Sequence, residues 1–186
     1  MTTPALPADI VDFWKNAGPA KWFKKSGAFD EALRRRFELV HHAAARGEHG
    51  AWARTAEGAL ALVLLFDQIP RNLYRGSGHA FATDPLARKA ARAMLDAGQD
   101  QEVDAALCTF CYMPFMHSED LADQDLSVRL FERHAADDPD RSNLEFALAH
   151  RDIIRRFGRF PHRNPALGRV TTAEEQAFLD DGGFAG

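Results

Sequence analysis

The longest uninterrupted run of apolar residues in the chain spans positions 59–66. A helix that is apolar on every side belongs in the middle of a core, so this run predicts the central helix of the fold. Polar residues follow at once, with Asp67, Arg71 and Arg75 spaced four apart and therefore stacked on one helical face. Because Pro70 lacks a backbone N–H and its ring crowds the preceding turn, we expect the helix to kink or restart there.

This polar face, which also contains Gln68 and Asn72, carries charge to the edge of the predicted core. Burying a charge is costly unless an opposite charge or several hydrogen bonds accompany it. Partners for Asp67 and Arg71 are therefore expected elsewhere in the chain.

Helical periodicity and capping residues divide the remaining sequence into further helices. Starts are indicated by Asp, Ser or Thr just before an apolar stripe, and ends by Gly or Pro. In the first half of the chain, we expect a helix capped by Asp9 and ended at Gly18, one from about Asp30 to Gly47, one from Thr55 to the break at Pro70, and one from Asp84 to about Gly98. In the second half, we expect a helix from Asp100 to Pro114, one from Ser118 to Asp138–Pro139, and one closed by Gly158. The last expected helix runs from the Thr172–Glu175 capping box through Leu179.

No segment alternates between apolar and polar residues with a period of two, so we expect an all-α protein. Short connections favour antiparallel neighbours, which predicts one domain over residues 1–186 with about seven to nine helices in antiparallel pairs.

Three smaller features complete the predicted fold. The aromatic residues around Trp14 and Trp22, including Phe23, are interpreted as anchors that lay the N-terminal segment onto the core. His41 is expected to be solvated near a helix end, and the tail from Gly182 onward to be frayed.

The composition is that of an ordinary soluble protein, with 46% hydrophobic and 27% charged residues. A net charge of −4 argues against a nucleic-acid partner. The longest apolar run is far below the roughly 18 residues that a membrane span needs, and the first residues lack the features of a signal peptide. We therefore expect a cytoplasmic protein with no membrane association and no cofactor, while the oligomeric state stays open.

The two cysteines, Cys108 and Cys111, do not form the disulfide framework of a secreted protein. A step of three residues on a helix places both thiols on one apolar face, so packing is favoured over a redox role.

The segment 155–169 contains five arginines and no acidic residue, in a chain of net negative charge. Aromatic residues such as Phe157 and Phe160 are interleaved with the arginines, so the segment must also pack. Two interpretations compete. The arginines pair with acids such as Asp67 and Glu119 and hold a structural loop, or they line a pocket for an anion, which suits the planar guanidinium fork.

His117, Ser118 and Glu119 stand at the expected start of a helix, where anions bind and a neighbouring His and carboxylate can transfer protons. In the simpler interpretation, Ser118 caps the helix, Glu119 meets the helix dipole and His117 packs. His150 lies on an apolar face, and with His162 it makes a shared site plausible. The histidines and Glu119 match no zinc spacing, so we predict no metal.

Four motifs in order carry a resemblance to a known family. They are Leu65-Phe66-Asp67-Gln68-Ile69-Pro70-Arg71-Asn72-Leu73-Tyr74-Arg75, then Phe81-Ala82-Thr83-Asp84-Pro85-Leu86-Ala87, then Pro114-Phe115-Met116-His117-Ser118-Glu119-Asp120, and Phe157-Gly158-Arg159-Phe160-Pro161-His162-Arg163-Asn164. Together they resemble the bacterial family called domain of unknown function 924 (DUF924), over nearly the whole chain. The resemblance implies an all-helical fold similar to tetratricopeptide-like superhelices, and it brings no known reaction.

We predict a pocket, lined by all the side chains below, that binds a small anionic molecule; whether it also catalyses a reaction is left open. Residues expected to bind the ligand are Asp67, Gln68, Arg71, Asn72, Arg75, Arg159 and Arg163, and the candidates for proton transfer are His117, Glu119, His150 and His162. The alternative is an interaction module with a structural ion-pair network, in which the arginines clamp an acidic peptide in an open groove.

Overall fold

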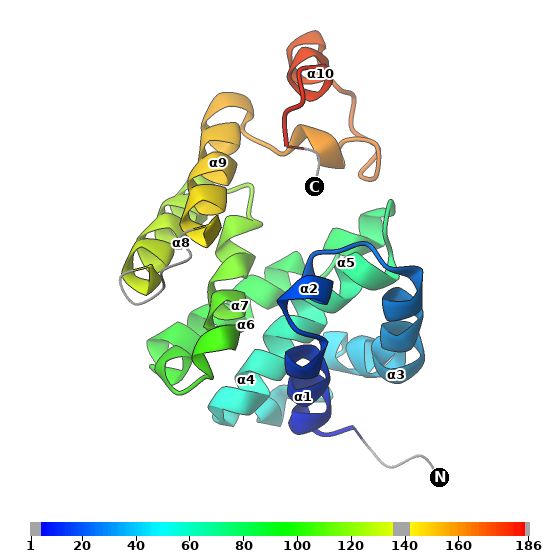
Figure 1. The fold of residues 1–186 in the computed structure, drawn as a ribbon, viewed down its shortest axis with the longest axis vertical. Coiled ribbons are helices and arrows are strands. Elements are labelled where there is room, and N and C mark those ends of the chain that lie inside the picture. The colour runs from blue at the N-terminus through cyan, green and yellow to red at the C-terminus, as the bar shows by residue number, and fades with distance from the viewer. Residues whose placement is uncertain (1–4, 136–141, 185–186) are drawn as a thin grey trace. The chain divides into compact units, whose positions relative to one another are not determined.

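The structure of the protein is a computed structural model that describes residues 5–135 and 142–184. Within these ranges the chain forms ten α-helical segments and no strand, which confirms the all-α prediction. Segments α4 and α5 follow one another through a π-helical turn, so the described residues form nine helices, within the predicted number. The segments labelled in Figure 1 are α1 Pro7–Ala17, α2 Pro19–Trp22, α3 Gly27–Ala45, α4 Ala56–Val63, α5 Ile69–Leu73, α6 Asp84–Asp96, α7 Ala105–Met116, α8 Leu121–His134, α9 Ser142–Phe157 and α10 Ala173–Asp180.

The interruption predicted at Pro70 takes the form of a π-helical turn over Leu64–Gln68. The N–H of Ile69 donates to the carbonyl oxygen of Leu64, five residues back, as a π turn requires. Pro70 then occupies the second position of α5 and donates no backbone hydrogen bond. The preceding carbonyl oxygens of Leu65 and Phe66 meet side chains instead, Nδ1 of His41 and the hydroxyl of Thr83. The turn buries Asp67 and Gln68 together with the apolar residues before them.

Internal contacts divide the chain into two compact units. The N-terminal unit comprises the described residues up to Arg75 together with His79–Pro114. The C-terminal unit comprises Gly76–Gly78 together with the described residues from Phe115 onward. The single domain expected from the sequence stays a prediction.

The core of the N-terminal unit is built around α4 and the π turn. Helix α4 packs against α1 and α6, and α3 packs against α5 and the π turn. Every residue of the run 59–66 is buried, and Trp14 and Phe110 are among the large side chains that are fully buried in this unit. The apolar run is therefore the central helix that its composition predicts.

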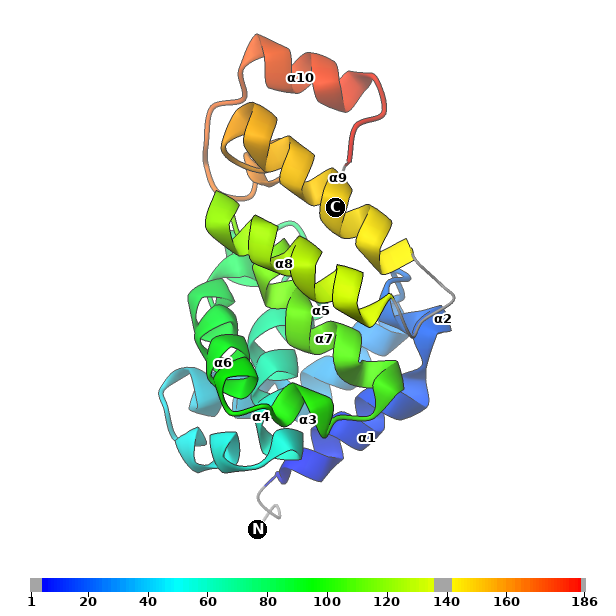
Figure 2. The ribbon, with the colours of Figure 1, turned by 90° about the vertical axis from the view of Figure 1, so that its left-hand side faces the viewer.

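The C-terminal unit contains one clear antiparallel helix pair. Helices α8 and α9 pack against each other, and Figure 2 shows them side by side and running in opposite directions. Ile153, Ile154 and Phe160 form a small buried core, against which Phe157 and Phe178 pack. The tetratricopeptide-like superhelix stays a prediction.

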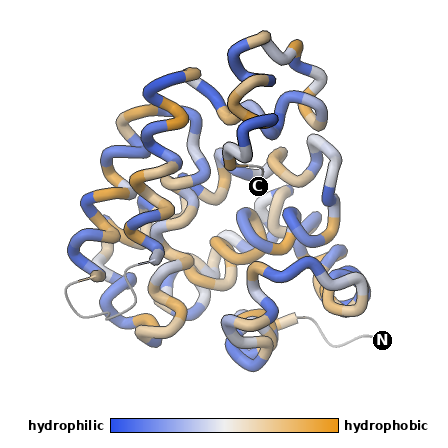
Figure 3. Tube along the Cα trace, turned by 45° about the horizontal axis from the view of Figure 1, so that its top comes forward, coloured by the Kyte–Doolittle hydropathy of each residue, from blue (hydrophilic) through white to orange (hydrophobic). Residues whose placement is uncertain are grey.

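Hydrophobic and hydrophilic positions alternate along most helices, as the orange and blue segments of Figure 3 show. Helix α3, for example, buries Leu33 and Phe37 and exposes Arg35 and Arg36. Such helices cover a core with one face and meet solvent with the other. No helix in the described ranges is long and apolar enough to cross a membrane.

The predicted cap of α8 is wrong by two residues. Its N-cap is Asp120, whose carboxylate accepts the N–H of Ala122 at 2.7 Å. The hydroxyl of Ser118 instead accepts the N–H of Asp120 at 3.2 Å. Ser118 therefore shapes the turn before the helix, and Asp120, whose backbone is extended, caps it.

The helix predicted from Asp100 to Pro114 is α7, which starts later and continues past the proline. Asp104 precedes it, and its carboxylate accepts the N–H of Ala106 at 3.0 Å. Most of α7 is buried by apolar side chains, and this burial outweighs the hydrogen bond that Pro114 removes.

The predicted N-caps of α1 and α6, Asp9 and Asp84, also lie inside the helices that they were expected to cap. Leu6 is the N-cap of α1, and the carboxylate of Asp9 reaches back to accept the Leu6 N–H at 2.8 Å. Asp84 is the first residue of α6 rather than its cap, which leaves its carboxylate available for other partners. The predicted break at Asp138–Pro139 lies outside the described residues.

His41 is buried rather than solvated, because its ring lies on the apolar face of α3. Its Nδ1 meets the carbonyl oxygen of Leu65 at 2.8 Å, and burial lowers the pKa of the ring. Trp14 and Trp22 are buried, as anchors of the N-terminal segment should be. Phe23 is 63% exposed but still stacks on the buried Phe110, with ring centroids 6.2 Å apart.

Gly58 lies very close to the backbone of Trp52, a contact that the sequence pattern does not predict. It lies in the first turn of α4, and a Cβ atom there would collide with the carbonyl oxygen of Trp52. We expect Gly58→Ala to lower the free energy of unfolding by about 1–3 kcal/mol, as overpacking does. The control is Gly27→Ala at the start of α3, where a Cβ meets no atom within 4 Å. Equal denaturation midpoints for the two variants would contradict the close approach.

Candidate functional site

Arg71 is held between two buried carboxylates in the N-terminal unit. Its Nη1 lies 3.2 Å from Oδ1 of Asp67 and 2.9 Å from Oδ1 of Asp84, and its Nη2 donates to Oδ2 of Asp84 at 3.1 Å. Asp67 is only 1% exposed and Asp84 only 6%. Burial alone would lower the pKa of Arg71, but the two carboxylates raise it, so the guanidinium stays charged.

The other polar residues of this face also have partners within the N-terminal unit. The Gln68 amide donates to Oδ2 of Asp67 at 2.6 Å. Arg75 makes a two-pronged ion pair with Asp30 at 2.8 and 3.0 Å, and it also donates to Oδ1 of Asn72 at 2.6 Å. This pattern is typical of a structural ion-pair network, and the ligand-binding role expected of these residues stays a prediction.

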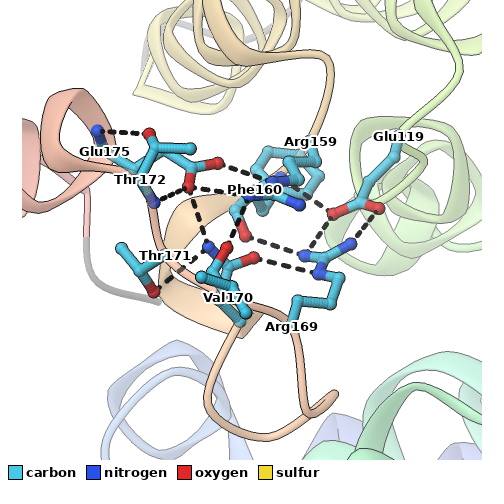
Figure 4. A network of polar contacts seen from close by, with 9 residues as sticks. Glu119, Arg159, Phe160, Arg169, Val170, Thr171, Thr172 and Glu175 are labelled. Carbon is cyan, nitrogen blue, oxygen red and sulfur yellow. Dashed lines mark hydrogen bonds and ion pairs between the residues drawn. The ribbon is translucent and has the colours of Figure 1, made fainter.

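In the C-terminal unit, Glu119 ties the turn before α8 to the loop after α9 (Figure 4). Its two oxygens accept hydrogen bonds from Arg169 at 2.7 and 3.0 Å, and Oε1 also accepts the N–H of Phe160 at 2.8 Å. Burial would raise the pKa of Glu119, but these contacts outweigh it and lower the pKa. Glu119 therefore stays an ionised carboxylate that positions the loop, and its predicted part in proton transfer stays a prediction.

A second ion pair fixes the same loop onto α10 (Figure 4). Arg159 donates to the two oxygens of Glu175 at 2.6 and 2.8 Å, and this contact is the main reason why the pKa of Glu175 falls to about 2. Glu175 also accepts the N–H of Thr172 at 2.8 Å, which completes the predicted capping box. One side chain thus caps α10 and holds the loop.

The loop that these pairs hold carries His162 and Arg163, which lie close to two further predicted site residues. We call His117, His150, His162 and Arg163 the histidine cluster. The rings of His117 and His150 lie 6.4 Å apart, centroid to centroid. Phe160 lies 5.4 Å from His150 and 5.6 Å from His162, and the Arg163 guanidinium lies over the Phe160 ring at 4.5 Å.

His150 is a buried, neutral base in this cluster. Its Nδ1 lies 2.7 Å from the carbonyl oxygen of Phe146, which can only accept, so Nδ1 carries the proton. The pKa of His150 falls to about 3, mainly because the ring is buried and in part because His117 and Arg163 lie nearby. The contact with Phe146 acts in the opposite direction and does not restore the ordinary pKa.

The structure brings some of the predicted site residues together and leaves others in separate groups. His117, His150, His162 and Arg163 lie in one cluster of the C-terminal unit, with Glu119 and Arg159 holding the loop that carries two of them. The candidates at positions 67–75 belong to the N-terminal unit, so the expected convergence of all these residues in one cavity stays a prediction.

Metal binding was the remaining alternative for the histidines. Across residues 5–135 and 142–184, no group of three or more His, Cys, Asp or Glu side chains is arranged to hold a metal ion. Cys108 and Cys111 are both buried in α7, as packing predicts, and the Cys108 thiol lies 3.2 Å from the Tyr112 hydroxyl.

Comparison with known proteins agrees with the fold and the motifs. The fold defines an all-α protein, and residues 10–183 match the family model described as bacterial protein of unknown function (DUF924). The chain belongs to this family. A solved structure of a protein of unknown function, ATU0120 from Agrobacterium tumefaciens, is 50% identical, with a TM-score of 0.89, and the match covers 94% of this chain and 97% of that one. A comparison with curated proteins gave no match.

The ion pairs of Arg71 with Asp67 and Asp84 should contribute strongly to the free energy of unfolding. We expect Arg71→Met to lower the free energy of unfolding by about 3–5 kcal/mol, because it removes the buried guanidinium that contacts both Asp67 and Asp84. Arg75→Met is the control, since its ion pair is more exposed and should contribute less than about 1 kcal/mol. Chemical denaturation of both variants measures the difference, and similar losses would show that Arg71 is solvated.

Because the buried His150 has a lowered pKa, the protein should lose stability in acid. Its imidazole has an ordinary pKa of 6.5 when unfolded and about 3 when folded, so below pH 6.5 the unfolded state binds a proton that the folded state does not. Stability should therefore fall with decreasing pH, by up to about 1.4 kcal/mol per unit below pH 6. Denaturation at several pH values should give His150→Gln a shallower slope than the wild type. Parallel slopes for His150→Gln and the wild type would contradict a neutral buried His150.

Proposed function

We propose that the C-terminal unit binds a small anion at the histidine cluster. The observation that supports this proposal most is the gathering of three imidazoles and one guanidinium, all of them groups that bind anions when charged. His150, His162 and Arg163 contact the Phe160 ring, and His117 lies next to His150. Groups of like charge lower one another's proton affinity, and this is what His117 and Arg163 do to His150. An anion in contact with the cluster would reverse this penalty.

The nearest acids are engaged in building the loop. Glu119 is occupied by Arg169 and by the Phe160 N–H, and Glu175 by Arg159. These pairs fix where Phe160 and the following residues lie without placing a carboxylate oxygen on the His150 ring. The arrangement supports recognition of a compact anion, such as a phosphate or a carboxylate, by a prepared set of donors.

Two finer expectations belong to the same proposal. The Nε2 atom of His150 has a lone pair available when Nδ1 is protonated, so His150 and its neighbours His117 and His162 are the groups that would accept a proton from a bound acid.

The acidic-peptide alternative uses the same cationic side chains. It predicts that a short acidic peptide binds more tightly than inorganic phosphate, which a direct comparison of affinities tests.

Isothermal titration calorimetry with inorganic phosphate tests the proposal. We expect binding to the wild type and an affinity about tenfold weaker for Arg163→Gln, since a lost charge-assisted contact contributes about 1.5–3 kcal/mol. Arg156→Gln is the matched control, because Arg156 is half-exposed and pairs with Glu174 on the surface. Absence of phosphate binding to the wild type, or equal weakening in both variants, would overturn the proposal.

A further inference from the structure

Phe184, near the C-terminal end of the chain, inserts its ring into the histidine cluster. Its centroid lies 4.4 Å from that of His150 and 5.2 Å from that of His162. Each of these histidines also contacts Phe160, so imidazole and phenyl rings alternate around a group of four. The tail that the sequence predicts to be frayed is thus packed as far as Phe184.

A glycine turn directs Phe184 into this position. Gly182 has a φ of 82°, in the left-handed region that favours glycine. The N–H of Gly183 donates to the carbonyl oxygen of Phe178 at 2.9 Å, and a Cβ atom on Gly183 would collide with Phe178. The turn therefore requires glycine at both positions to bring the chain back from α10 to His150.

The four rings are attached to the fold in different ways. His150 is held in α9, and Phe160 is held by Glu119 and Arg169 through its backbone N–H and carbonyl oxygen. Phe184 follows two glycines, so rotation about their backbone torsions can move its ring away without opening a helix. Phe184 is also only partly buried, whereas Phe160 is fully buried.

We propose that Phe184 occupies the place of the ligand's own ring, so that the preferred ligand is an anion carrying a planar aromatic group. This inference rests on the proposed function, because the anionic group would meet Arg163 and the histidines. The aromatic group would contact the faces of His150 and His162 that Phe184 covers. Aromatic rings prefer such stacked or edge-to-face contacts with one another, which a plain anion cannot make.

Competition with phenyl phosphate and with inorganic phosphate tests the inference by calorimetry. In the wild type, phenyl phosphate must displace Phe184, so its advantage over phosphate should be small. In Phe184→Ala that competitor is gone, and the affinity ratio of phenyl phosphate to phosphate should rise about tenfold, the factor expected for one aromatic pair together with its burial. The affinity for inorganic phosphate should change by less than about twofold, a free-energy change well below that of one ring contact.

Two further variants keep the test decisive. Gly183→Ala should undock Phe184 without removing its ring and should raise the same ratio, which covers the case in which Phe184→Ala does not fold. Phe23→Leu is the control, because Phe23 is a largely exposed ring that stacks on Phe110 in the N-terminal unit. An unchanged or lower ratio in Phe184→Ala and Gly183→Ala, with phosphate still bound, would overturn this inference alone. Loss of phosphate binding in the wild type would overturn the proposed function as well.

Discussion

The structure of the N-terminal unit depends on the cost of burying the Arg71 guanidinium. That charge is tolerable only because Asp67 on the π turn and Asp84 at the start of α6 both reach it. The π turn aims Asp67 at Arg71 from the end of an apolar helix, and the one-residue shift of the α6 start leaves the Asp84 carboxylate available for the same partner. The π turn and the start of α6 therefore position the two carboxylates that Arg71 contacts.

The C-terminal unit uses ion pairs for a different purpose. Glu119–Arg169 and Arg159–Glu175 hold a largely non-helical loop against α8 and α10, and this loop carries Phe160, His162 and Arg163. In this unit the paired charges lie around the histidine cluster, and the cluster itself contains only imidazoles and a guanidinium. Opposite charges meet in the contacts of Arg71 with Asp67 and Asp84, which is typical of a structural network. Imidazoles and a guanidinium gather in the histidine cluster, and this is the basis of the proposed anion binding.

The elements that depend on neighbouring residues could be predicted from the sequence. Period and capping residues predicted the all-α class, the Thr172–Glu175 capping box and the disturbance at Pro70, because each depends on residues within one or two turns. The partners of Arg71 and Arg75 were not predictable, since Asp84 and Asp30 lie 13 and 45 residues away and each has an ordinary local explanation as a first-turn acid. Phe184 was missed for a related reason: a glycine-rich end is typical of a frayed tail, and only the close approach of Gly183 to Phe178 shows that it is packed.

The central claim, that an anion bound at the histidine cluster raises the proton affinity of the buried His150, is most directly tested by NMR titration of its ring nitrogens with and without saturating inorganic phosphate. Without phosphate, His150 should stay neutral with Nδ1 protonated over the whole pH range in which the protein remains folded, as its pKa of about 3 requires. With phosphate, the midpoint should rise by at least about one unit, because an adjacent anion favours the charged imidazole. His41, buried in the N-terminal unit, should not respond. A His150 midpoint that phosphate leaves unchanged would contradict the account.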